Sequence, residues 1–151
     1  MLRKILKIFI YLFFINSLYA AKEGSGYNRG LKKNIISKIT KNLDNNNYEK
    51  AISLLKVEIA KDKKNAELYN LMGYAYRNLN NFDLSIKNYK KALNIKPNHL
   101  GVHNYIGIAY LRIGNLYKAK VHLLKLRELC KGKCNEYKNL KKELSDNKKN
   151  E

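Results

Sequence analysis

The chain has 151 residues and 45% apolar content, enough for one domain with a sizeable core. Its net charge of +19 is unusual: 31 lysines and arginines oppose 12 aspartates and glutamates. This balance fits either a solvated helical surface or a surface that binds anionic partners, and the N-terminal sequence argues against nucleic acid as that partner.

Residues 1–21 have the layout of a secretory signal peptide. Three basic residues precede an uninterrupted apolar run over 8–15, and small residues follow at Ala20 and Ala21. The apolar run is short for a bilayer span, which needs about 20 residues. We expect a signal peptide over 1–20, with a retained N-terminal anchor as the alternative. Residues 21–30 contain three glycines and predict a flexible linker.

Residues 31–65 predict two helices. Apolar residues recur at helical spacing over 31–43, and Asp44-Asn45-Asn46-Asn47 predicts a turn. A clearer apolar stripe follows over 48–59, where Tyr48, Ala51 and Leu55 share one side. The polar stretch 61–65 joins this helix to the next segment.

The most regular pattern lies over residues 66–97. One apolar stripe includes Leu68, Met72 and Ala75, and a second stripe runs from Phe82 to Ile95 after the helix-breaking Asn80-Asn81 pair. Pro97, the single proline of the chain, ends the second helix. Gly73 costs roughly 1 kcal/mol against alanine inside a helix, so we expect it to allow close approach of another helix.

The remaining residues predict two more helices and a cap. Asn98 is a plausible N-cap for a fifth helix, Gly114-Asn115 predicts a turn, and a sixth helix covers 116–129. Residues 135–144 predict a helix that covers the end of the array, and 145–151 a polar tail that frays.

The landmarks of the central segment recur after thirty-four residues. Gly73 is matched by Gly107, and Tyr76 by Tyr110. A repeat of this length indicates an array of helical hairpins that bury their apolar stripes against one another. The predicted fold class is therefore all-α.

The segment resembles the tetratricopeptide repeat. The residues that carry the resemblance are the large Tyr69, Met72, Tyr76, Phe82 and Tyr89, the small Gly73, Ser85 and Ala92, and Pro97. The resemblance implies a right-handed superhelical array over 31–144, with repeats at about 32–65, 66–99 and 100–133. It also implies that the first helix of each hairpin lines a concave, peptide-binding groove. The groove residues it implies are Asn70, Tyr74, Arg77, Asn104, Tyr105, Ile108 and Arg112.

Cys130 and Cys134 are the only cysteines and flank a glycine turn. In an exported protein such a pair indicates a structural disulfide, and small exported bacterial tetratricopeptide proteins are similar in this region. A redox dithiol normally has two intervening residues, and a metal site needs more than two thiols, so both alternatives are weaker.

No catalytic constellation is present, and we expect neither an enzyme nor a cofactor. His99 and His103 have metal-ligand spacing, but no third ligand accompanies them, so packing roles are favoured for both, while His122 stands alone. The chaperone-binding clamp known in the family does not fit Leu71 and Ile108.

The sequence predicts an exported adaptor, expected in the bacterial periplasm, that binds a peptide segment of a cell-envelope protein. The alternative is a basic module that associates with anionic membrane or cell-wall polymer. A thiol redox enzyme at the two cysteines is the weakest interpretation.

Overall fold

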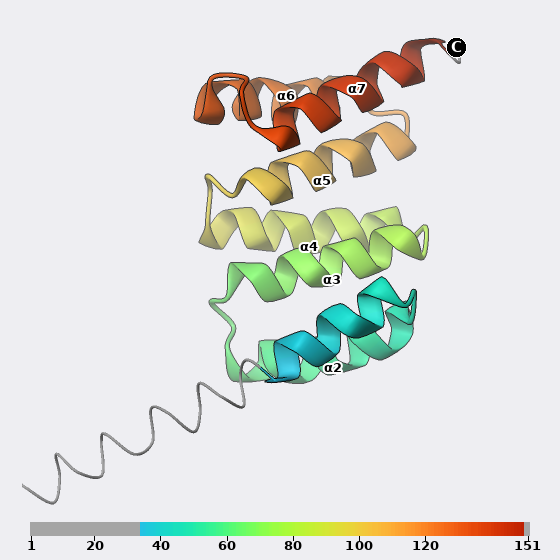
Figure 1. Cartoon of the computed structure of the whole chain (residues 1–151), viewed down its shortest axis with the longest axis vertical. Coiled ribbons are helices and arrows are strands. Elements are labelled where there is room, and N and C mark those ends of the chain that lie inside the picture. Colours follow the sequence, from blue (N-terminus) through green and yellow to red (C-terminus); the bar gives the residue numbers. More distant parts are fainter. Residues whose placement is uncertain (1–33, 150–151) are drawn as a thin grey trace, which may run out of the picture. The chain divides into compact units, whose positions relative to one another are not determined.

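The computed structural model describes residues 34–149, and these residues form helices and no strand (Figure 1). The predicted signal peptide and linker lie outside the described residues. The chain divides into two units after Lys41, and a helix over residues 34–44 crosses this boundary. The larger unit, Asn42–Glu151, contains the repeats with the most regular sequence pattern.

Six further helices make up this unit. They are α2 (Tyr48–Lys61), α3 (Ala66–Asn78), α4 (Phe82–Ile95), α5 (Leu100–Arg112), α6 (Leu116–Cys130) and α7 (Asn135–Lys149). Each helix packs against its neighbour in the chain from α2 to α7, and α7 also packs on α5. In Figure 1, α3, α5 and α7 form the front layer, with α4 and α6 behind them. The arrangement is a helical repeat solenoid, as the sequence predicts.

The core lies between the two layers. On α4 the buried residues Ser85, Ile86, Tyr89 and Ala92 follow the helical spacing read from the sequence. The same core continues through α5 and α6 to Leu140 of α7. The repeats over α3–α6 and helix α7 therefore share one core, which is the expected behaviour of a stacked array.

The turns repeat with the same period as the helices. Asn46, Asn80 and Gly114 all have left-handed backbone conformations, with φ of 59°, 57° and 71°. Asparagine and glycine tolerate this conformation better than other residues, and it closes the end of the preceding helix. The next residue caps the following helix: the Asn81 side chain accepts a hydrogen bond from the Leu84 N–H, and Asn115 from the Lys118 N–H.

The N-termini of α3 and α5 are capped by Asn65 and His99, respectively. Asn65 accepts a hydrogen bond from the Glu67 N–H, and His99 Nδ1 accepts one from the Val102 N–H at 3.4 Å. The prediction that Asn98 caps α5 is therefore wrong. Pro97 and Asn98 form the turn before the helix, so the cap falls one residue later.

Both repeat glycines face a neighbouring side chain closely, as predicted. A Cβ atom at Gly73 would lie 2.6 Å from Tyr89 Cε1, and one at Gly107 would lie 2.5 Å from Leu140 Cδ2. Gly73 thus makes room for α4 of its own hairpin, whereas Gly107 makes room for α7.

Helix α7 is longer than the sequence predicts, because it continues past Leu144 to Lys149. The Ser145 hydroxyl donates to the Lys142 carbonyl inside the helix, and no proline or glycine interrupts the segment. The described part of the predicted polar tail is therefore helical. Among residues 34–149 no helix is long and apolar enough to cross a membrane.

Candidate functional site

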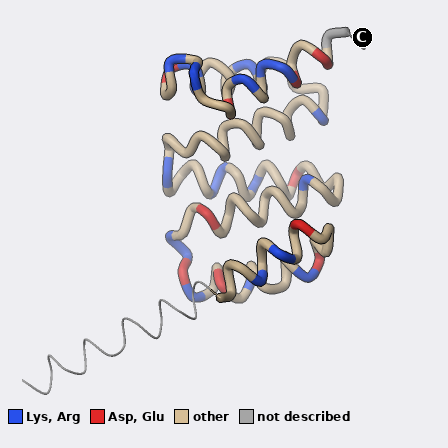
Figure 2. Tube along the Cα trace, in the orientation of Figure 1, with Lys and Arg blue, Asp and Glu red and all other residues tan. Residues whose placement is uncertain are grey.

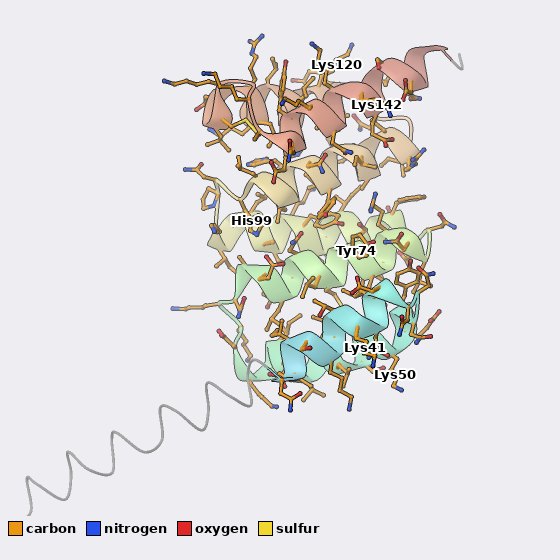
Figure 3. The ribbon with its side chains drawn as sticks, viewed as in Figure 1. Lys41, Lys50, Tyr74, His99, Lys120 and Lys142 are labelled. Carbon is orange, nitrogen blue, oxygen red and sulfur yellow. A yellow bond between two sulfur atoms is a disulfide. The ribbon has the colours of Figure 1, made fainter. Side chains whose placement is uncertain are left out.

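A cluster of aromatic and cationic side chains lies where α3 and α5 adjoin. On α3, Asn70, Tyr74 and Arg77 are spaced i, i+4 and i+7 and so lie on one face of the helix. Tyr105 reaches this face from α5: its ring centroid is 5.7 Å from that of Tyr74, which is labelled in Figure 3.

The Arg77 guanidinium contacts the faces of both rings. Its Cζ atom lies 5.3 Å from the Tyr74 centroid and 5.4 Å from the Tyr105 centroid. A planar guanidinium over two electron-rich faces is held in place by cation–π attraction. Tyr89 of α4 stacks on Tyr105 from within the core, with centroids 6.2 Å apart. Burial raises the pKa of Tyr89, so its hydroxyl stays neutral.

Arg77 has no carboxylate partner among the described residues. Its Nε atom is buried and makes no hydrogen bond there, and the same holds for the hydroxyls of Ser85 and Tyr89. Arg77 lies close enough to Tyr89 to act on the ionisation of its hydroxyl, which does not replace a carboxylate. A partly buried cation without an anion is energetically unfavourable, so the guanidinium can still pair with a carboxylate of a ligand. The sequence pattern indicates only a core position for Tyr89, because its role in supporting Tyr105 depends on a contact between two repeats.

Asn70 and Asn104 occupy equivalent positions in consecutive repeats. Asn70 donates from Nδ2 to the Glu67 carboxylate at 3.1 Å, but its Oδ1 atom is buried and unpartnered. The Oδ1 atom of Asn104 is also buried and unpartnered within the described part of the chain. Both amide oxygens are therefore left without a hydrogen-bond donor in the described part of the chain, but neither is exposed on the surface.

Ile108 and Arg112, also predicted for the groove, do not join this cluster. Ile108 is 5% exposed and belongs to the core, because α5 is covered by α7 as well as by α4 and α6. Its prediction as a partner-contacting residue is not supported by this burial. The exposed Arg112 pairs with Glu143 of α7 at 3.4 Å. Asn70 and Asn104, also predicted for the groove, are as buried as Ile108, so the candidate site consists of Tyr74, Arg77 and Tyr105.

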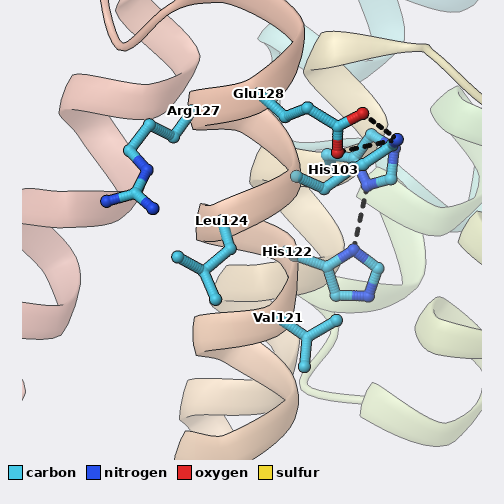
Figure 4. Close-up of a pocket in the computed structure, with 7 residues that line it drawn as sticks. His103, Val121, His122, Leu124, Arg127 and Glu128 are labelled. Carbon is cyan, nitrogen blue, oxygen red and sulfur yellow. Dashed lines mark hydrogen bonds and ion pairs between the residues drawn. The ribbon is translucent and has the colours of Figure 1, made fainter.

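The histidines have structural partners. His99 Nε2 lies 3.0 Å from the Glu67 carboxylate and so links the starts of α3 and α5. His103 Nε2 donates to the Pro97 carbonyl at 2.8 Å, and its Nδ1 lies 2.9 Å from Nδ1 of His122 (Figure 4). His122 is therefore not isolated, contrary to the expectation from the sequence. In residues 34–149, no three metal-ligating side chains gather where they could hold a metal ion.

The geometry of the histidine pair fixes its protons. Since a carbonyl accepts only from an N–H, His103 carries its proton on Nε2, and its Nδ1 accepts from the Nδ1–H of His122. Burial, with the nearby charges of His103 and Lys90, lowers the pKa of His122 to about 4. Burial also lowers the pKa of His103. The pair is neutral at pH 7.

Cys130 and Cys134 lie side by side between α6 and α7, with Cα atoms 5.8 Å apart. This separation is within the range that a disulfide spans. Left-handed conformations at Lys131 and Gly132 turn the chain between them. The Cys130 Sγ atom is held against the Leu126 carbonyl of the preceding turn.

Comparison with known families supports the repeat assignment. A family model described as TPR repeat matches residues 73–114. A protein of Guillardia theta, the uncharacterized protein ycf37, is 37% identical over 75 residues, which are 49% of this chain. The chain spans only 40% of the length of that relative.

Solved structures with the same arrangement of helices include two peptide complexes. The type III secretion chaperone SycD of Yersinia enterocolitica, in complex with a peptide of the translocator YopD, matches with a TM-score of 0.68. The match is 19% identical and covers 78% of this chain and 89% of that one. The first TPR of Spaghetti (RPAP3), bound to an HSP90 peptide, also matches with a TM-score of 0.68, at 20% identity. That match covers 74% of this chain and 88% of that one.

Proposed function

Because the chain is a tetratricopeptide repeat protein, we propose that it binds a segment of another protein against the cluster formed by Tyr74, Arg77 and Tyr105. The observation that carries the proposal is Arg77, a cation held between two aromatic rings with no anion beside it in the described residues. A carboxylate of the bound segment would supply the missing charge.

The neighbouring groups fit the rest of such a segment. The partly exposed rings of the two tyrosines would cover an apolar side chain of the segment. SycD and RPAP3 in their solved complexes each hold a peptide on this fold. The fold generally serves as an interaction scaffold, and binding requires no catalytic group.

We propose the periplasm as the compartment and an envelope protein as the partner. The basic, apolar and small segments of residues 1–21 support export. An oxidising compartment would also favour a disulfide between Cys130 and Cys134, whose side chains already adjoin.

The test is crosslinking from the site itself. The full chain would carry a photo-crosslinking amino acid in place of Asn78, which is partly buried one residue beyond Arg77, and the crosslinked partner would be identified from native cells. The affinity for that partner would then be measured for Arg77→Ala combined with Tyr74→Ala. We expect at least a tenfold loss, about 1.4 kcal/mol, with unchanged helical content by circular dichroism.

Arg112→Ala provides the matched control, because Arg112 also lies on a front-layer helix but already pairs with Glu143. It should change the affinity less than threefold. Equal affinities for the double variant and the unaltered protein, or equal losses for both arginines, would refute the proposed site.

A further inference from the structure

The outer face of α6 carries an exposed apolar stripe. Tyr117, Val121 and Leu124 are 77%, 45% and 52% exposed. Their spacing of i, i+4 and i+7 places them on one side of the helix, opposite the buried Ala119 and Leu126. The stripe is therefore separate from the side of α6 that packs into the core.

Among the described residues, no other helix of the larger unit has a comparable surface. Ile113, in the turn before α6, is also 46% exposed. The other exposed large apolar residues in this part of the chain are single ones, Val57 on α2 and Ile95 at the end of α4. Isolated apolar residues on a surface are ordinary, but a continuous row usually marks a surface that binds something.

Basic side chains flank the stripe on both sides. The helical spacing places Lys118 and Lys125 along one edge and Lys120 and Arg127 along the other. Glu128, the single acidic residue of α6, pairs with Lys125 at 2.9 Å. The same spacing places Glu128 in line with the stripe beyond Leu124, so the face has an apolar row that ends in one acidic residue and a margin of four basic residues. Its net charge is positive, and Figure 2 shows basic residues predominating along this helix.

This combination fits the interfacial region of an anionic bilayer. A helix that lies in a membrane interface buries an apolar face among acyl chains while lysines and arginines reach the headgroups. Each basic residue close to such a surface is attracted to the anionic lipids and strengthens the attachment. The three members of the stripe project from a single helix surface, and the aliphatic Val121 and Leu124 favour acyl chains over a polyanion, which offers them no apolar partner.

The placement also leaves the candidate peptide site open. Helix α6 lies in the rear layer and the Tyr74–Arg77–Tyr105 cluster belongs to the front layer (Figure 1). A protein seated on a membrane through α6 would therefore present its front layer to a partner.

We propose that the outer face of α6 docks on an anionic lipid bilayer, with Tyr117, Val121 and Leu124 at the level of the acyl-chain boundary and the flanking basic residues on lipid phosphates. This inference is independent of the peptide site, since no residue is shared between the two surfaces.

The chain contains no tryptophan, so a single introduced one reports its own surroundings. The full chain with Tyr117→Trp would be mixed with vesicles of 30% phosphatidylglycerol in phosphatidylcholine, and with vesicles of phosphatidylcholine alone. The matched control is Val57→Trp, at an exposed apolar position on α2. We expect a blue shift and quenching by brominated lipid for Tyr117→Trp with the anionic vesicles, and neither change for Val57→Trp. An unchanged Tyr117→Trp spectrum, or equal quenching at both positions, would overturn the proposal.

Co-sedimentation with the same vesicles distinguishes binding through the outer face of α6 from binding through the positive charge of the whole protein. The combined change Tyr117→Ser, Val121→Ser and Leu124→Ser should weaken binding to anionic vesicles at least tenfold, and Lys118→Gln with Lys120→Gln and Arg127→Gln should do the same. Removing three exposed lysines elsewhere, at Lys50, Lys56 and Lys87, should change it less than threefold. Because every variant keeps residues 1–21, differences between them come from the altered surfaces. Equal losses in both charge variants would overturn the proposal.

Discussion

The central repeat, α3–α4, and the third repeat, α5–α6, share a thirty-four-residue register but differ in what covers them. Helix α3 keeps Tyr74 and Arg77 partly exposed, whereas α5 is buried over most of its length. The difference comes from α7, which packs on both α5 and α6. The same repeat position is therefore partly exposed, and part of the candidate site, in one unit, whereas it is core in the other.

The two glycines show the difference at atomic scale. The missing side chain of Gly73 accommodates the Tyr89 ring of its own hairpin, and that of Gly107 accommodates Leu140 of the capping helix. The same repeat position is thus glycine in both units, although the side chain that needs the space comes from a different helix in each.

A second difference lies at the packing position four residues before each glycine. Tyr69 in the central repeat has the Lys91 ammonium 5.4 Å from its ring centroid, whereas the third repeat has His103 at this position, paired with His122. His122 replaces Asn88 of the central repeat. Of these two repeats, only the third therefore contains two titratable imidazoles in contact.

The largest expected effect comes from removing the cap's main contact. Leu140 is fully buried, and Leu140→Ala should lower the free energy of unfolding by about 2 to 5 kcal/mol, the usual cost of such a cavity. Urea unfolding would measure it. Leu124→Ala, at an exposed leucine, is the control and should cost less than about 0.5 kcal/mol. Similar losses in the two variants would show that α7 does not close the array.

The histidine pair should make the third repeat sensitive to acid. The pKa of His122 is about 4 in the folded protein and near 6.5 in the unfolded chain, so the unfolded chain binds more protons between these values. Stability should therefore fall as the pH drops from about 6.5 towards 4, by about 2 kcal/mol at pH 4.5.

His122→Asn, which installs the residue of the central repeat, should remove most of this dependence. The groups that surround His122 are His103, Tyr110, Lys90 and, beyond His103, Lys125. Urea unfolding at pH 7 and pH 4.5 on both proteins makes the comparison. If the two lose the same stability, carboxylates elsewhere account for the acid effect.

Replacing each glycine by alanine should lower stability by different amounts, because Gly73 faces an aromatic ring and Gly107 faces the methyl groups of a leucine. A Cβ atom at Gly73 would lie within 3.0 Å of three atoms of a fully buried aromatic ring, and overpacking costs typically 1 to 3 kcal/mol. After the gain of roughly 1 kcal/mol in helix propensity, Gly73→Ala should still destabilise by about 1 kcal/mol. Gly107→Ala meets the end of a flexible leucine and should destabilise less. The reverse order in thermal unfolding would contradict this explanation.

Replacing both cysteines should change the stability of the protein least. Cys130→Ser with Cys134→Ser opens a very short loop, so the oxidised protein should lose at most about 2 kcal/mol. Its melting temperature would be compared with that of the unaltered protein with and without dithiothreitol. A reductant-insensitive melting temperature in the unaltered protein, together with two alkylatable thiols, would show that the proposed disulfide does not form.

Much of the fold follows from the sequence, because helix faces, turns and repeat glycines all obey local rules. The periodic stripe of α4 and the Asn80-Asn81 turn are examples that the structure confirms. The errors at the cap of α5 and the end of α7 concern single helix boundaries, where competing local hydrogen bonds decide the outcome.

The candidate site is less predictable, because it depends on contacts between repeats. The repeat register places Tyr74, Arg77 and Tyr105 on the inner helices, but it does not indicate that Arg77 stacks on both rings. It also assigns Ile108 to the groove, since the coverage of α5 by α7 is a tertiary effect with no local signal. The pairing of His122 with His103 escapes prediction for the same reason.

The regular turns at Asn46, Asn80 and Gly114 make the array modular. Each is followed by an asparagine at the start of the next helix, so duplicating residues 81–114 would create one new junction, Gly114 to Asn81, that matches the existing Gly114-Asn115 step. Such a lengthened protein would gain one hairpin while Gly107 still received Leu140. Array length is thus a property that evolution or an engineer can change in whole steps without redesigning either end.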